Sequence, residues 1–199
     1  MKQSKVNGMN EQRRQVLVAG AGLMVLGATG CTTTSDASGD PAARRQAIDS
    51  AADSALTRLY TQHGGTKELV ASARGVLIFP SFVSAGFIFG AGSGQGVLRK
   101  GGKSSGYFQM TEASAGLLAG AQSQAVFILF MTDEALKRFE GSSGWTAGVD
   151  ASVSMINVGA NAQVTTQTAR QEVIGFVMTN AGLMGNVSLN GNRVSRLDI

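Results

Sequence analysis

The chain has 199 residues, and 43% of them are hydrophobic, which is enough for one domain with a substantial core. Its 27 glycines follow no three-residue period, so a collagen-like structure is excluded, and its single cysteine excludes an intrachain disulfide. The formal net charge is +4, but four of the 17 basic residues and one of the 13 acidic residues lie in the first 30 positions. The remaining chain is nearly neutral, with thirteen basic and twelve acidic residues, so its charge does not favour nucleic acid as a partner.

The first 31 residues have the order of an export signal. Arg13 and Arg14 precede an apolar run over residues 16–26, and small residues then lead to Cys31. This order predicts a signal peptide over residues 1–30 that ends at a lipid-acceptor cysteine. A signal-anchor helix is the alternative, but the uncharged run over residues 15–31 is shorter than the roughly 20 apolar residues that span a bilayer.

This segment resembles the signals of bacterial lipoproteins, which implies anchoring through acyl chains such as palmitate on Cys31. Arg13-Arg14 also resembles a twin-arginine signal, and both this route and the general secretory route stay open. Thr32 after the cysteine, in place of Asp, favours the outer membrane, with the domain facing the periplasm or exposed at the cell surface. Small polar residues follow, so we expect residues 31–40 to tether a folded domain over residues 41–199.

The first predicted elements of the domain are two helices. Asp40 and Pro41 form a favourable helix start, and apolar residues recur at helical spacing until two glycines at positions 64 and 65 end the helix. These apolar residues are Ile48, Ala52, Ala55, Leu56 and Leu59. Thr66 is expected to cap a second, short helix that runs through residue 73.

The following residues predict strands. A run over residues 76–79 is bounded by Pro80, and further strands are expected over residues 85–89 and 96–99. Lys-Gly-Gly-Lys at positions 100–103 predicts a hairpin turn into a strand over residues 106–110. The glycine-rich residues 90–96 are expected to join two strands, because they lack the spacing of a phosphate-binding loop.

The second half of the chain predicts further strands and one more helix. Residues 125–131 predict a central strand buried on both faces, and Thr132 is the expected cap of a helix over residues 133–140. Strands are also expected within residues 148–164 and 172–178, and Asn190-Gly191 predicts a tight hairpin between residues 187–189 and 193–197. The sequence therefore predicts a single α+β domain, whose antiparallel β-rich core of about eight to ten strands carries two N-terminal helices and one inserted helix.

No group of residues predicts catalysis, so we do not expect an enzyme. The one histidine, His63, lies at the predicted end of a helix, where it is expected to interact with the helix dipole. Without a second histidine or an available cysteine thiolate, no metal site is expected, and no cofactor is indicated. The adjacent carboxylates Asp133 and Glu134 fall at a helix start, which explains them as partners of the helix dipole.

Small and apolar residues in a distinctive order carry a resemblance to a known family. They begin with Ala-Arg-Gly-Val-Leu-Ile-Phe-Pro at 73–80, Ala-Gly-Phe-Ile-Phe-Gly at 85–90 and Gly-Gln-Gly-Val-Leu at 94–98. They continue at residues 114–122, 126–131, 135–139, 148–151 and 182–191. Over most of residues 41–198 the chain closely resembles a SYLF domain.

The resemblance implies lipid binding, because eukaryotic SYLF proteins bind phosphoinositides or other anionic phospholipids, and some bind actin or its regulators. Bacterial members are commonly lipoproteins. We therefore expect a membrane-anchored lipoprotein whose SYLF-like domain binds anionic phospholipid, with head groups like those of phosphoinositides or phosphatidic acid. Ser84 stands where the family often has Lys, so a head-group preference is not transferred. The alternative is an envelope module that binds a protein partner and is tethered by its lipid.

Basic side chains are the candidates for contact with anionic lipid, because each Lys or Arg near such a surface contributes about 1 kcal/mol. The candidates on the two predicted helices and at the predicted hairpin are Arg44, Arg45, Lys67, Arg74, Arg99, Lys100 and Lys103. The last three form the densest cluster, since no acidic residue follows them before Glu112.

Overall fold

The computed structural model describes residues 40–86, 89–115, 120–155, 171–179, 182–183 and 189–199. The predicted signal peptide over residues 1–30, the acceptor Cys31 and the tether as far as residue 39 lie outside these ranges. Asp40–Ile199 forms one compact unit. None of the described helices is both long and apolar enough to cross a membrane.

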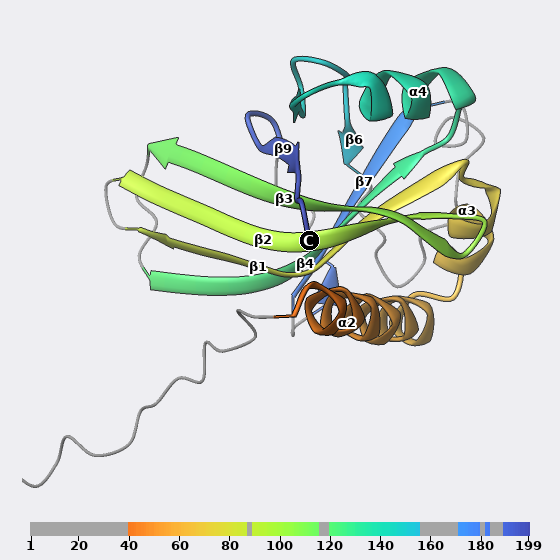
Figure 1. Cartoon of the computed structure of the whole chain (residues 1–199), viewed down its shortest axis with the longest axis horizontal. Coiled ribbons are helices and arrows are strands. Elements are labelled where there is room, and N and C mark those ends of the chain that lie inside the picture. The colour runs from red at the N-terminus through yellow and green to blue at the C-terminus, as the bar shows by residue number, and fades with distance from the viewer. Residues whose placement is uncertain (1–39, 87–88, 116–119, 156–170, 180–181, 184–188) are drawn as a thin grey trace, which may run out of the picture. The chain divides into compact units, whose positions relative to one another are not determined.

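The unit is built on one curled, mixed sheet, and its α+β class is the predicted one (Figure 1). The helices are α2 (Pro41–Gln62), α3 (Thr66–Ser72) and α4 (Asp133–Gly141). The strands are β1 (Gly75–Gly86), β2 (Phe89–Lys100), β3 (Lys103–Ala115), β4 (Gly120–Phe130), β5 (Trp145–Thr146), β6 (Ser154–Met155), β7 (Val173–Thr179), β8 (Gly182–Leu183) and β9 (Arg193–Arg196). The two N-terminal helices and the inserted helix are thus confirmed.

The described strands follow the order β5-β9-β3-β2-β1-β4-β7-β6, and β8 also pairs with β7. β6 and β7 are parallel, so the expectation of an antiparallel core is wrong for this pair. A parallel pair needs a crossover of a dozen or more residues, and residues 156–172 between the two strands are long enough to provide it.

The sheet has a separate hydrophobic cluster on each face. On one face, α2 and α3 cover residues that include Val76, Ile78 and Phe127. On the opposite face, α4 covers residues that include Phe108 and Phe130. Figure 1 shows α2 and α4 on these two sides of the strands, and both clusters consist of fully or nearly fully buried side chains.

Local chemistry accounts for α2 but not for the predicted start of α3. The Asp40 carboxylate accepts a hydrogen bond of 2.9 Å from the Ala42 amide, and Pro41 is the first helical residue, as predicted. The cap of α3 is Gly65, so Thr66 as the cap is wrong. Thr66 is the first residue of the helix, and its buried hydroxyl donates to the His63 carbonyl at 2.6 Å.

The boundaries of the first two strands differ from those predicted. β1 continues through Pro80, and its register with both neighbouring strands shifts next to this residue. A bulge accommodates proline in a sheet because the missing N–H does not interrupt a regular ladder there. The glycine-rich residues 90–96 lie within β2 and do not form a connection.

Close packing explains why this strand is rich in glycine. A Cβ atom on Gly96 would lie 2.4 Å from the Ile78 carbonyl oxygen and 2.5 Å from the Phe79 ring. A Cβ atom on Gly92 would lie 2.5 Å from the Phe82 ring. The glycines therefore leave room for the buried aromatic side chains of β1 to lie against β2.

β4, α4 and β7 lie where the sequence predicts them, but β3 is longer than the strand predicted over residues 106–110, and β5 and β8 are not predicted. β6 falls within the region 148–164 where strands are expected, and residues 156–164 of that region lie outside the described ranges. Residues 126–130 of β4 are fully buried, and the Thr132 hydroxyl accepts a hydrogen bond of 3.2 Å from the Ala135 amide at the start of α4. The β2–β3 hairpin turns at Gly101 and Gly102, whose φ angles of 55° and 79° favour glycine.

The final turn is also present, but its strand has other partners. The Asn192 amide donates to the Leu189 carbonyl at 3.1 Å, which closes the turn around Gly191. β9 lies between β3 and β5, and the predicted partner residues 187–188 lie outside the described ranges.

Candidate functional site

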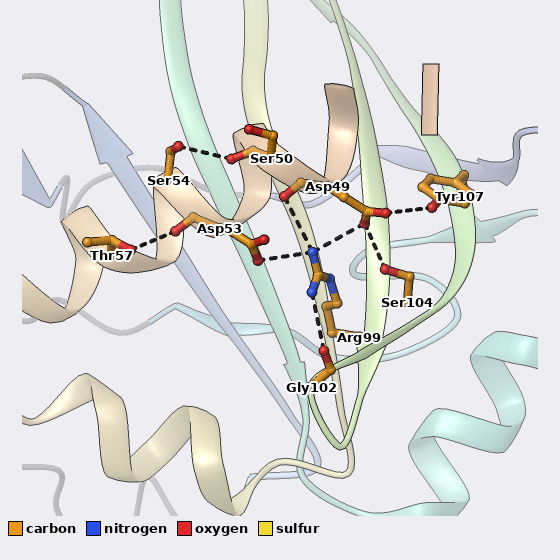
Figure 2. Close-up of polar contacts among 9 residues, drawn as sticks. All are labelled: Asp49, Ser50, Asp53, Ser54, Thr57, Arg99, Gly102, Ser104 and Tyr107. Atoms are coloured by element: carbon orange, nitrogen blue, oxygen red, sulfur yellow. Dashed lines mark hydrogen bonds and ion pairs between the residues drawn. The ribbon is translucent and has the colours of Figure 1, made fainter. Parts of the chain in front are cut away.

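A polar network joins helix α2 to the β2–β3 hairpin, and Asp49 of α2 is its centre (Figure 2). One oxygen of its carboxylate, Oδ2, accepts a hydrogen bond of 2.8 Å from the Tyr107 hydroxyl. The other, Oδ1, accepts one of 2.7 Å from the Ser104 hydroxyl and lies 3.2 Å from Arg99 Nη2. The carboxylate thus receives three donors from two strands.

Arg99 is the second hub of this network. Its Nη2 atom lies 3.0 Å from the Asp53 carboxylate, in addition to its contact with Asp49. Its Nη1 atom donates to the Gly102 carbonyl at 3.2 Å, and the side chain is only 15% exposed. Arg99 is therefore neutralised by two carboxylates that are about 50 positions away in the sequence. Its Nε atom is buried and has no hydrogen-bond partner among the described residues.

Lys100 is also paired, but on the opposite face of the sheet. Its ammonium group lies 2.7 Å from Glu140 at the end of α4. Neighbouring residues of a strand point to opposite faces, so Arg99 contacts α2 and Lys100 contacts α4. Two of the three charges in the hairpin cluster are therefore engaged by acidic groups of the domain itself.

The other basic candidates fall into paired and unpaired groups. Arg45 donates to the Ile199 carbonyl, and Arg74 lies 3.6 Å from Asp133 with both side chains well exposed. Within the described residues, no ion pair forms at the remaining three, which are Arg44, Lys67 and Lys103. Lys67 and Lys103 are exposed, so their charges are available to an external anion.

A cavity of about 460 Å³ lies where α2, α3, β1 and the β2–β3 turn meet. Its apolar wall includes Leu56, Val70, Val76 and Ile78. Its polar wall is formed by Asp53, Tyr60, Lys67 and Arg99, together with the turn glycines 101 and 102. The structure thus brings Lys67 and Arg99 to one cavity. Lys103 follows the turn but is paired with Lys100, so it belongs to the opposite face of the sheet.

Burial shifts three pKa values in this region. Burial raises the pKa of Tyr60, which lines the cavity. Burial raises the pKa of Tyr107, and its hydrogen bond to Asp49 raises it further. Burial lowers the pKa of His63, whose Nε2 atom is buried without a described partner. This environment favours the neutral imidazole, whereas the interaction expected with the helix dipole would favour the charged form.

Sequence reasoning found the basic residues but missed their acidic partners. Asp49, Asp53 and Glu140 have no sequence signal that connects them to residues 99 and 100, because the pairing depends on how helices dock on the sheet. The cavity was missed for the same reason. Whether any candidate contacts lipid stays a prediction.

Comparison with known proteins identifies one family. Residues 111–198 match the family described as "Ysc84: Las17-binding protein actin regulator", which is the SYLF domain. The motifs of the resemblance that precede residue 111 lie outside the matched range. No curated protein was found that matches the chain. The match confirms the predicted resemblance to the SYLF family, over residues 111–198 of this chain.

Proposed function

We propose that this chain is a lipoprotein anchored in the outer membrane, and that its SYLF-like domain faces the periplasm and binds anionic phospholipid. The lipid anchor on Cys31 is supported by the sequence pattern over residues 12–31. The lipid-binding activity is supported by the family match, since SYLF proteins bind lipid.

The observation that carries the proposal for this domain is that two exposed ammonium groups, those of Lys67 and Lys103, form no ion pair in the part of the chain that the structure describes. Lys67 lines the cavity on the α2 side, whereas Lys103 is paired with Lys100 across the hairpin and therefore belongs to the α4 face. Neither side chain has an ion-pair partner among the described residues. Arg99 and Lys100 already have carboxylate partners, so we assign them a structural role and give the lipid contact to Lys67 and Lys103.

Co-sedimentation with vesicles tests this proposal. The protein is residues 32–199, which contain the compact unit Asp40–Ile199 and lack both Cys31 and the apolar run over residues 16–26, so that neither an acyl group nor the predicted signal peptide can cause binding. It is mixed with neutral or anionic phospholipid vesicles at low and physiological salt. We expect binding to anionic vesicles that weakens as salt rises. The double variant Lys67→Gln/Lys103→Gln should bind at least tenfold more weakly, because two charges contribute about 2 kcal/mol.

Lys137→Gln is the matched control, because Lys137 is an exposed lysine of α4, on the face of the sheet opposite to Lys67. It should retain full binding. Equal binding to neutral and anionic vesicles, or equal loss in the control and the double variant, would contradict the proposal.

A protein-binding module tethered by its lipid is the second candidate. Figure 1 shows that one end of β1 and β2 extends beyond α2. The supporting observation is that Phe89, the first residue of β2, is 78% exposed and Val83 of β1 is 48% exposed. An exposed apolar patch can mark an interaction surface, and Phe89 is the most exposed aromatic side chain among the described residues. The family description, which names Las17 binding, also points to a protein partner for that family. Cross-linking in the intact envelope to a defined partner that Phe89→Ser abolishes would support this candidate.

A further inference from the structure

The cavity between α2, α3 and the β2–β3 turn combines an apolar wall with one uncompensated cation. Its volume of about 460 Å³ falls within the range of 300–1,000 Å³ that is typical of small-molecule sites. Leu56, Val70, Val76 and Ile78 supply apolar surface. Such a wall favours a hydrocarbon group over a sugar or a nucleotide, which would need many more hydrogen-bonding partners.

The charged side chains of the cavity wall leave one positive charge unpaired. Asp53 and Arg99 both line the cavity, but they form an ion pair of 3.0 Å with each other, and Arg99 also contacts Asp49. Lys67 is the remaining charged residue of the wall, and its ammonium group has no partner among the described residues. An apolar ligand with one anionic end would match this arrangement.

We propose that the cavity binds a single alkyl chain that ends in an anionic group, with the chain against the apolar wall and the anion beside Lys67. A fatty acid and a lysophospholipid share this chemistry. The inference rests on the proposed lipid-binding function, and it adds that the fold encloses part of one lipid molecule and does not only contact a charged surface.

Calorimetric titration with a series of short alkyl carboxylates tests the proposal. The protein is residues 32–199, so that neither an acyl chain on Cys31 nor the apolar run over residues 16–26 competes for the cavity. Octanoate, nonanoate and decanoate are used below their micelle concentrations. Each added methylene should tighten binding about fourfold while the cavity still has room. Affinity that does not depend on chain length, or no binding at all, would overturn the inference.

Two pairs of variants locate the ligand. Ala71→Phe places a large side chain at an exposed position of the cavity wall and should abolish decanoate binding. Ala47→Phe makes the same change at an exposed position of α2 away from the cavity and should not affect binding. Lys67→Met should weaken decanoate at least tenfold and leave the affinity for neutral decanol unchanged, whereas Lys137→Met should affect neither. Because Lys67 is exposed, its substitution gives an answer even if Ala71→Phe impairs folding.

Two further comparisons identify the class of lipid and separate this inference from the proposed function. Tighter binding of decyl phosphate than of decanoate points to a lysophospholipid, and the reverse order points to a fatty acid; both support the cavity. A chain that binds decanoate but not anionic vesicles keeps this inference and loses the proposed function. Binding to vesicles but to no alkyl anion would support the proposed function and overturn this inference. Equal binding of decanoate by Ala71→Phe and Ala47→Phe would also overturn this inference.

Discussion

Replacement of Asp49 by Ala should be the most destabilising single change in the polar network of Figure 2. The substitution removes the acceptor for Tyr107 at 2.8 Å and for Ser104 at 2.7 Å, together with one of the two carboxylates that neutralise Arg99. These contacts are the polar links between the first half of α2 and the strands β2 and β3.

The magnitude follows from which groups lose their partners. A hydrogen bond to a charged group contributes about 1.5–3 kcal/mol, and less when water can replace it. The Tyr107 bond is partly buried and is lost outright, while Ser104 is exposed and can bond to water. Arg99 keeps Asp53 and the Gly102 carbonyl. We therefore expect a loss of about 2–3 kcal/mol in the free energy of unfolding, or roughly 4–12 °C in Tm for a domain of this size.

Urea unfolding followed by the fluorescence of Trp145 measures this loss, because Trp145 is the only tryptophan and is 2% exposed. Asp53→Ala is the matched control on the same helix. Its side chain is 63% exposed, and among the described residues its carboxylate pairs only with Arg99, so the substitution should cost less than about 1 kcal/mol. Equal losses for the two variants would refute the assignment of Asp49 as the centre of the network.

Two further substitutions test other parts of the fold. Gly96→Ala should destabilise the domain by about 2–3 kcal/mol, because its Cβ atom would meet the Ile78 carbonyl. A Cβ atom on Gly64 would have nothing within 4 Å, so Gly64→Ala should change stability by less than about 0.5 kcal/mol. Similar urea unfolding midpoints for the two variants would contradict the packing argument. His63 has a native pKa below its ordinary value of 6.5, so the unfolded chain takes up a proton first and the free energy of unfolding should fall as the pH drops through 6.5. His63→Gln should remove this dependence from stabilities measured at several pH values. An unchanged dependence would show that another group causes it.

The elements that the sequence predicted correctly are those with strong local signals. Asp40 and Thr132 cap α2 and α4 through hydrogen bonds between neighbouring residues, and such bonds need no knowledge of the rest of the fold. The apolar run of β4 is equally visible in the sequence because the strand is buried on both faces.

The errors fall where tertiary packing overrides a local rule. Glycine and proline ordinarily end strands, but Pro80 lies beside a bulge and Gly96 makes room for the Phe79 ring. The sequence of β2 alone does not indicate that aromatic rings of β1 will occupy the space above it. The ion pairs of Arg99 likewise depend on Asp49 and Asp53 of α2, which become its neighbours only in the folded chain.

The opposite contacts of Arg99 and Lys100 link two helices that lie on different faces of the sheet. Arg99 forms an ion pair with Asp49 of α2, and Lys100 forms one with Glu140 of α4. Two adjacent residues at the end of β2 therefore connect the helices on both faces of the sheet. A local opening of the β2–β3 hairpin would therefore loosen both helices at once, which makes them part of one cooperative unit although they lie on opposite faces of the sheet. A ligand that steadies the β2–β3 turn from the α2 side would then slow amide exchange in α4, on the far side of the sheet.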